Sequence, residues 1–349
     1  MRVNRAVLAC SLLLTAAASA PQRYDWGAEN LDPSYFGADV AAEASSTQKV
    51  CQAQLAAEPP ASDGPTPDDR VRLKECDSEA LYYGIGIPAD PVAARKCAMI
   101  EREREIGPNA QEFAGLGYSY FSGTGILAMI YANGAGTPRN LDVAIHMACG
   151  VEDAPAASEG RIQALLERLA GKGGSKPFEI CDNATSGVSE GYCADHLNRI
   201  EDQTRKRRIA AFGATWPEPL RRAFDRVYAS FSRYAETAHD MDCFGGTAHA
   251  ACTIAGASAD QTDFLRRIEA LAAGHRPQRR FPQEGESLSP ALAPLDLREV
   301  PKEERALYRS NYEETVAARA AFEKDLVAFM RAAFPTWSAH DVRVMFRDL

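Results

Sequence analysis

Apolar side chains recur every three or four residues over much of the second half of this 349-residue chain, the spacing of one face of an α-helix. In the clearest stretch, residues 219–237, the apolar positions are Leu220, Phe224, Val227, Phe231 and Tyr234. Residues 260–273 and 302–333 repeat this spacing, whereas few stretches alternate with the period of two that marks a β-strand. The pattern predicts an all-α protein whose second half is an antiparallel helical domain.

A shorter pattern occurs twice in the first half of the chain. Residues 83–98 read YGIGIPADPVAARKCA, and residues 131–149 read YANGAGTPRNLDVAIHMAC. At a fixed offset Gly84, Gly86, Pro88, Ala94 and Ala98 align with Gly134, Gly136, Pro138, Ala144 and Ala148. Each copy predicts a helical hairpin, in which a first helix ends at a left-handed glycine and a second helix buries its alanines. Such hairpins need neighbours to cover their apolar faces, so a short stacked array is expected.

The first residues have the features of a secretory signal peptide. Two arginines precede an apolar run over residues 6–14, which is too short to span a membrane, and small residues follow. Cleavage after Ala18 fits the small-x-small rule. Cleavage after Ala20 and lipidation of Cys10 are less favoured alternatives, because proline would follow the first cut and the apolar run before Cys10 is very short.

Composition divides the chain into four parts. Residues 1–18 are the predicted signal peptide, and residues 19–69 are an irregular lead-in with one helix at 39–57 and a proline-rich linker at 59–69. Residues 70–175 hold the two hairpins and a helix at 159–170, with an ordered loop expected at 101–125. Residues 176–349 form the second domain, which opens with a compact loop at 178–193 before helices resume at residue 195.

Eight of the nine cysteines lie beyond the predicted signal peptide, and an even number in an exported chain favours disulfide bonds. Local spacing suggests three pairs, which are Cys76 with Cys97, Cys181 with Cys193, and Cys243 with Cys252. These pairs would leave Cys51 for Cys149, although spacing alone does not fix the connectivity. The predicted location is therefore periplasmic or secreted.

The formal net charge of −9 argues against a nucleic-acid partner and is compatible with a basic protein partner. None of the six histidines stands in a known catalytic or metal-binding motif, so we expect a non-enzymatic protein without a cofactor or a resident metal. Glu101, Glu103 and Glu105 alternate with arginines, which is typical of a solvent-exposed helical face.

The doubled motif resembles the Sel-one-like branch of the tetratricopeptide-like repeats, whose hairpins carry a Y-x-x-G-x-G turn and an alanine-rich second helix. Residues 131–136 (YANGAG) fit this turn, and Ala144 occupies the position of the helix alanine. In the first copy Tyr83 directly precedes Gly84, which departs from the pattern. The resemblance covers about residues 70–170 and implies a repeat module that presents a surface for protein binding.

The second half is similar to the lysozyme inhibitor LprI-like family of exported helical domains. Residues 220–224 (LRRAF) and 245–248 (GGTA) match two of its recurrent features. The last helix departs from the pattern, because it lacks the usual tryptophan and has Lys324 before Asp325 where Arg-Asp is usual. The resemblance implies an inhibitor of a muramidase or another wall-degrading enzyme. An envelope scaffold that binds partners through the repeat module is the alternative.

The richest polar segment, residues 239–252, is the candidate site. In the first hypothesis it is a recognition loop, in which Cys243 and Cys252 close the base, Gly245 and Gly246 shape the turn, and Thr247 and His249 are presented. A hydroxyl and an imidazole could bond to the two catalytic carboxylates of a muramidase. The alternatives are a zinc site on Cys243, His249, Cys252 and either His239 or Asp242, and a stapled connection between helices without a binding role.

Overall fold

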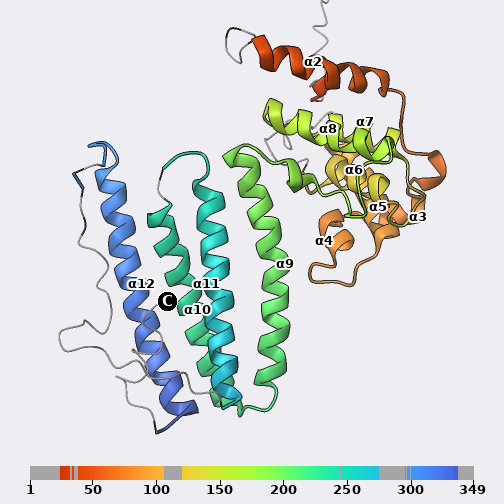
Figure 1. The fold of residues 1–349 in the computed structure, drawn as a ribbon. Coiled ribbons are helices and arrows are strands. Elements are labelled where there is room, and N and C mark those ends of the chain that lie inside the picture. Colours follow the sequence, from red (N-terminus) through yellow and green to blue (C-terminus); the bar gives the residue numbers. More distant parts are fainter. Residues whose placement is uncertain are drawn as a thin grey trace, which may run out of the picture.

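A computed structural model describes residues 24–31, 34, 38–105, 120–243, 245–274, 295, 297, 298 and 300–336. Every regular element within these residues is helical and none is a strand, which confirms the all-α prediction. Shorter helices near the N-terminus form one part of the molecule, and four long helices lie beside them (Figure 1). None of the described helices has the length and apolarity needed to cross a membrane.

The two predicted hairpins are present and are built alike. Helix α4 (Ser78–Tyr83) is followed by α5 (Pro91–Glu105), and α6 (Gly123–Asn133) is followed by α7 (Leu141–Cys149). Gly84 and Gly134 end the first helix of each pair with φ values of 75° and 70°, the left-handed conformation that glycine adopts without a steric cost. Asp90 and Asn140 then begin the second helices, because their side chains accept from the backbone N–H three residues later.

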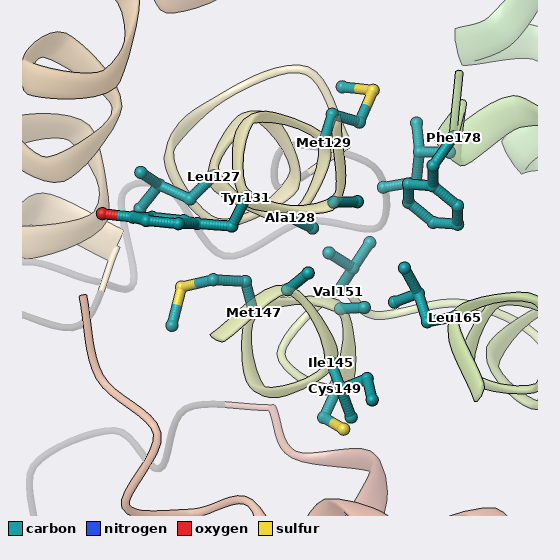
Figure 2. Close-up of a cluster of buried hydrophobic side chains, with 14 of the residues drawn as sticks. Leu127, Ala128, Met129, Tyr131, Ile145, Met147, Cys149, Val151, Leu165 and Phe178 are labelled. Atoms are coloured by element: carbon teal, nitrogen blue, oxygen red, sulfur yellow. The ribbon is translucent and has the colours of Figure 1, made fainter. Parts of the chain in front are cut away.

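Helix α6 lies at the centre of the first hydrophobic core (Figure 2), and its residues from Gly123 to Ala132 are all buried. It packs between α5 and α7, and α8 (Pro155–Leu169) packs in turn against α7. The alanines of the repeated motif, Ala94, Ala98, Ala144 and Ala148, are at most 1% exposed, so small side chains allow the close approach of the paired helices.

The segments predicted as linker and loop contain more regular structure than expected. Residues 59–69 include the 3-10 helix η2 (Ala61–Asp63) and the start of α3 (Pro67–Arg72), which a reciprocal Thr66–Asp69 capping box stabilises. The loop predicted at 101–125 is wrong at both ends, because α5 continues to Glu105 and α6 begins at Gly123. Its aromatic residues Phe113 and Tyr118 lie outside the described residues.

Glu101 and Glu105 do not form the solvent-exposed face that their spacing predicts. The backbone N–H groups of Ser78 and Gly123 each donate to the Glu101 carboxylate at 3.0 Å, and the Ser78 hydroxyl also bonds to it. Glu105 accepts from the hydroxyl groups of Ser122 and Thr124. The two carboxylates therefore satisfy the N-terminal ends of α4 and α6, and the exposed Glu103, paired with Arg70, fits the prediction.

Burial raises the pKa of Glu101 to about 7 from its ordinary value of 4.5. At pH values between these two pKa values, Glu101 is protonated more often in the folded protein than in the unfolded chain. The free energy of unfolding therefore falls as the pH rises through this range. The slope approaches about 1.4 kcal/mol per pH unit. We expect the wild-type protein to lose stability relative to Glu101→Gln across this window, as measured by urea unfolding at several pH values. Parallel pH dependences for the two proteins would contradict this role of Glu101.

The N-terminal helix α2 (Ala38–Ala53) covers α7 and α8, in agreement with the helix predicted at 39–57. The disulfide between Cys51 and Cys149 joins α2 to α7. Trp26 lies beneath α2 with 1% exposure, and its indole N–H donates to the hydroxyl of Thr47 at 3.0 Å. The lead-in is thus part of the first core.

The second half consists of α9 (Gly187–Gly213), α10 (Glu218–Asp242), α11 (His249–Ala272) and α12 (Arg305–Ala333). The predicted apolar positions of α10 and α11 meet those of α12 in a second core, whose central rings belong to Phe224, Phe231, Phe264, Phe322 and Phe329. Two of these helices begin earlier in the sequence than predicted, at residues 187 and 249 instead of 195 and 260. Helix α9 begins at Gly187 because Ser186 and Ser189 form a capping box, and α11 begins at His249 with small residues that carry a weak apolar period.

Helix α9 belongs to both parts of the molecule. Cys193 near its start lies in the first core with Phe178 and Ile180, so this core extends past the predicted boundary at residue 175. Farther along, Ile209 and Phe212 pack against the second core. A continuous helix of 27 residues therefore joins the two cores, and only its first turns, up to Cys193, lie where the sequence suggested a loop.

A buried polar cluster fixes α9 to α4. The His196 ring nitrogen Nδ1 lies 2.6 Å from Oε1 of Glu79, and the Arg199 guanidinium pairs with the other oxygen of the same carboxylate. The His196 ring stacks on Phe121, with ring centroids 4.0 Å apart. Burial lowers the pKa of His196 to about 4, so the imidazole is neutral at physiological pH. The position of α9 thus depends on groups from three distant segments.

A candidate binding groove between α9 and α11

A groove of about 880 Å³ lies between α9 and α11, beside the predicted recognition loop. Its apolar lining consists largely of one leucine and several alanines, namely Leu197, Ala194, Ala248, Ala251, Ala255 and Ala259. On each helix the lining residues follow at intervals of three or four, so they form one continuous face. Because alanine carries a single methyl group, the two helices approach closely, and the small side chains leave an open groove along one side of the pair.

Disulfide bonds hold the walls of the groove. Cys181 and Cys193 join η4 (Ile180–Asn183) to α9, and Cys243 and Cys252 join the end of α10 to the first turn of α11. Three of these four cysteines line the groove. The pair Cys76–Cys97 is formed as well, so the three pairs suggested by spacing are present, and the two remaining cysteines, Cys51 and Cys149, are also joined.

One end of the groove is polar. Arg205, which is 2% exposed, donates to the hydroxyl of Ser258 and to the side-chain oxygen of Asn198, both at 2.8 Å. The Ser258 hydroxyl in turn donates to Glu201 at 2.9 Å. This network holds the middle of α9 against α11. The carboxylate side chain of Glu201 is nevertheless 56% exposed at the rim of the groove.

The rim carries an excess of negative charge. Glu190 and Glu201 lie on the α9 side, and Asp263 and Arg266 lie on the α11 side, where they pair with each other. Asp263 also accepts from Arg267 at 2.7 Å. The groove therefore combines an apolar floor with an acidic α9 edge, a lining suited to an apolar segment that carries basic side chains on one flank.

The structure places the predicted recognition loop at one end of this groove. Gly245 and Gly246 have φ values of 96° and 78°, so both turn residues use the left-handed conformation that glycine favours. Thr247 is exposed, and its backbone lies directly against Gly187 at the start of α9. The loop is thus seated on α9, and Ala248 next to it belongs to the groove lining.

The side chain of His249 forms two hydrogen-bond contacts with other residues of the chain. Its Nδ1 lies 3.0 Å from the carbonyl oxygen of Cys243, and its Nε2 lies 2.9 Å from Oδ1 of Asp240. The second oxygen of Asp240 accepts from the side-chain amide of Asn311 at 3.0 Å. The imidazole that the sequence suggests as a contact for a partner therefore joins the ends of α10 and α11 to α12.

The zinc alternative does not fit this segment. Cys243 and Cys252 are joined to each other, so neither offers a thiolate, and His239 lies 2.9 Å from Asp260 of α11. The hydrogen bond to Asp260 raises the pKa of His239, as expected for a histidine beside a carboxylate.

The groove itself was not predicted from the sequence. Its signal was the run HAACTIAGASA at residues 249–259, in which small residues occupy nearly every position. Such a run predicts a helix surface without large side chains, but it does not show which helix lies beside it. Comparisons of the chain with family models, with curated proteins and with solved structures gave no match.

Proposed function

We propose that the protein is an exported, non-enzymatic binding protein that inhibits or neutralises a lysozyme-like enzyme acting on peptidoglycan. The observation that carries the proposal is the groove between α9 and α11, an apolar concavity with an acidic rim and disulfide-held walls. A surface that is already shaped before binding loses little conformational entropy when a partner docks. These are properties of a binding surface for another protein.

Two further observations support the location and the partner. Four disulfide bonds indicate folding in an oxidising compartment, and the periplasm or the cell exterior, where wall-degrading enzymes act, is the location we propose. The acidic rim and the net charge of −9 would attract a basic muramidase at long range and speed its association. The choice of a muramidase rests on the resemblance of residues 220–224 and 245–248 to the LprI-like family.

The test is the lytic rate of a standard muramidase on a cell-wall suspension, with and without the purified, oxidised protein. We expect the lytic rate to fall in proportion to the added protein until the enzyme is saturated. An unrelated acidic protein at the same concentration controls for unspecific charge effects, and it should leave the rate unchanged. A full lytic rate in a large molar excess of the protein would contradict the proposal.

Capture from an envelope extract tests the alternative, a scaffold that binds partners through the repeat module. The hairpins are already contacted by α2 on one side and, through Glu79 and His196, by α9 on another, so the geometry favours the groove. Recovery of a partner unrelated to the cell wall, by a protein that leaves muramidases fully active, would favour the scaffold.

A further inference from the structure

We infer that the groove between α9 and α11 accepts an α-helix of the partner, with an apolar face toward the floor and basic side chains along the α9 edge. The inference builds on the proposed function, since it specifies how a partner would occupy the binding surface. It has three supports, which are the shape of the floor, the position of α9 in the fold, and the charge of the rim.

The floor has the dimensions and the spacing of a helix-binding surface. On α11 the lining residues are Ala248, Ala251, Cys252, Ala255, Ser258, Ala259 and Thr262, which repeat at intervals of three and four. From Ala248 to Thr262 this face extends about 21 Å at 1.5 Å per residue, enough for a four-turn helix. Helices pack with axes 8–10 Å apart when the contacting side chains are small. An alanine floor therefore suits a helix that inserts larger apolar side chains of its own.

Among the residues that the structure describes, none forms a helix that covers this face of the α9–α11 pair. The four long helices lie in the order α12, α10, α11 and α9, with α9 at the edge (Figure 1). The second core is formed mainly by α10, α11 and α12, whereas α9 packs along α11. A partner helix seated on α9 and α11 would complete a three-helix arrangement with them.

Charge selects the kind of helix. Asp263 on the α11 edge already pairs with Arg266 and Arg267, so the carboxylates open to a partner are Glu190 and the 56% exposed Glu201 on the α9 edge. Lysine or arginine side chains on the flanks of a bound helix would lie opposite these carboxylates. A second copy of the chain that placed its α9 edge on this one would bring the same carboxylates together, and like charges in close contact oppose association. The rim therefore favours a basic partner over self-association.

The binding test uses three synthetic labelled peptides and fluorescence anisotropy with the full oxidised protein. The peptides share one alanine and leucine face and differ elsewhere: the first carries lysines on both flanks, the second carries glutamates, and the third is the lysine peptide with a central proline that prevents the helix. We expect binding of the first alone, with an affinity that decreases as salt is added. Equal binding of the lysine and glutamate peptides, or full binding of the proline peptide, would overturn the inference.

Matched variants locate the bound peptide. Ala255 is exposed on the floor, and Ala255→Arg places a long charged side chain in the groove, so we expect the affinity for the lysine peptide to fall at least about tenfold. Ala272→Arg makes the same change at an exposed position of α11 outside the groove and should bind like the wild-type protein. Unchanged binding by Ala255→Arg, in a protein with wild-type thermal unfolding, would exclude the groove.

Charge reversal at the rim gives an independent measure. Glu190→Lys should weaken binding of the lysine peptide about three- to tenfold and reduce its salt dependence, whereas Glu313→Lys, an equal charge change on exposed α12, should not. Dimerisation of the wild-type protein that Ala255→Arg abolishes would assign the groove to a second copy and overturn the inference.

The two proposals can fail separately. Muramidase inhibition that is equal for the wild-type protein and for Ala255→Arg would retain the function and reject the groove as the helix site. Specific binding of the lysine peptide by a protein that inhibits no muramidase would retain the helix site and reject the function.

Discussion

Replacement of Cys51 and Cys149 by alanine is expected to lower the free energy of unfolding of the first core by about 4–5 kcal/mol. The disulfide joins residues separated by 98 positions, so its loss frees a long loop in the unfolded chain. Cys51 and Cys149 are 0% and 2% exposed, and their replacement also removes packing between α2 and α7. We expect α2 and the lead-in around Trp26 to separate from the core at a lower temperature than the long helices.

Urea unfolding followed by tryptophan fluorescence measures this effect, because Trp26 is buried beneath α2. The control is the double alanine variant of Cys243 and Cys252, whose positions are only 9 residues apart. Loop-closure entropy predicts that removing this second disulfide lowers the free energy of unfolding by about 2–3 kcal/mol, roughly 2 kcal/mol less than removing the disulfide of the long loop. Equal losses for the two variants would contradict the assignment of the main effect to the long loop.

The substitution Gly187→Ala is expected to destabilise the contact between α9 and the α10–α11 loop by about 3 kcal/mol. A Cβ atom at this position would overlap the backbone of Thr247 and Ala248, and neither can turn aside as a flexible side chain could. The loop or the start of α9 must move, and Ala248 would shift away from the groove. We therefore expect both a lower stability and weaker binding of the lysine peptide.

Gly213→Ala is the matched control, because it lies in the same helix and its Cβ would meet no heavy atom within 4 Å. Alanine in place of glycine there should be neutral or stabilise the helix by up to about 1 kcal/mol. Thermal unfolding and peptide binding of the two variants provide the comparison. Wild-type stability of Gly187→Ala would show that the loop is not seated on α9 as described.

Local sequence signals predicted most of the helices. The doubled glycine, proline and alanine positions predicted the two hairpins, and α4 and α6 end at Gly84 and Gly134 as expected, because a left-handed glycine and an alanine face act within a few residues. The apolar spacing of Phe224, Phe231 and Phe264 likewise placed α10 and the second half of α11. The first half of α11 was missed, because small residues give little contrast between its faces.

The candidate site was predicted in part. The glycine turn and the Cys243–Cys252 pair follow from residues close in sequence, and both are present. The partners of His249 were not predictable, because Asn311 of α12 holds the Asp240 side chain to which it bonds. The buried carboxylate of Glu101 was mistaken for an exposed one for the same reason, since its donors come from α4 and α6.

By itself the sequence indicated the helical class, the doubled hairpin and the three local cysteine pairs, since periodicity, turn glycines and cysteine spacing act over short stretches of chain. Only the tertiary structure decided that α9 joins two cores and that it lies along the alanine-rich half of α11. The groove exists because the alanine-rich face of α11 lies beside α9, and the side chains of the two helices do not fill the space along the pair. The groove is formed by the two helices together, and neither helix would form it alone.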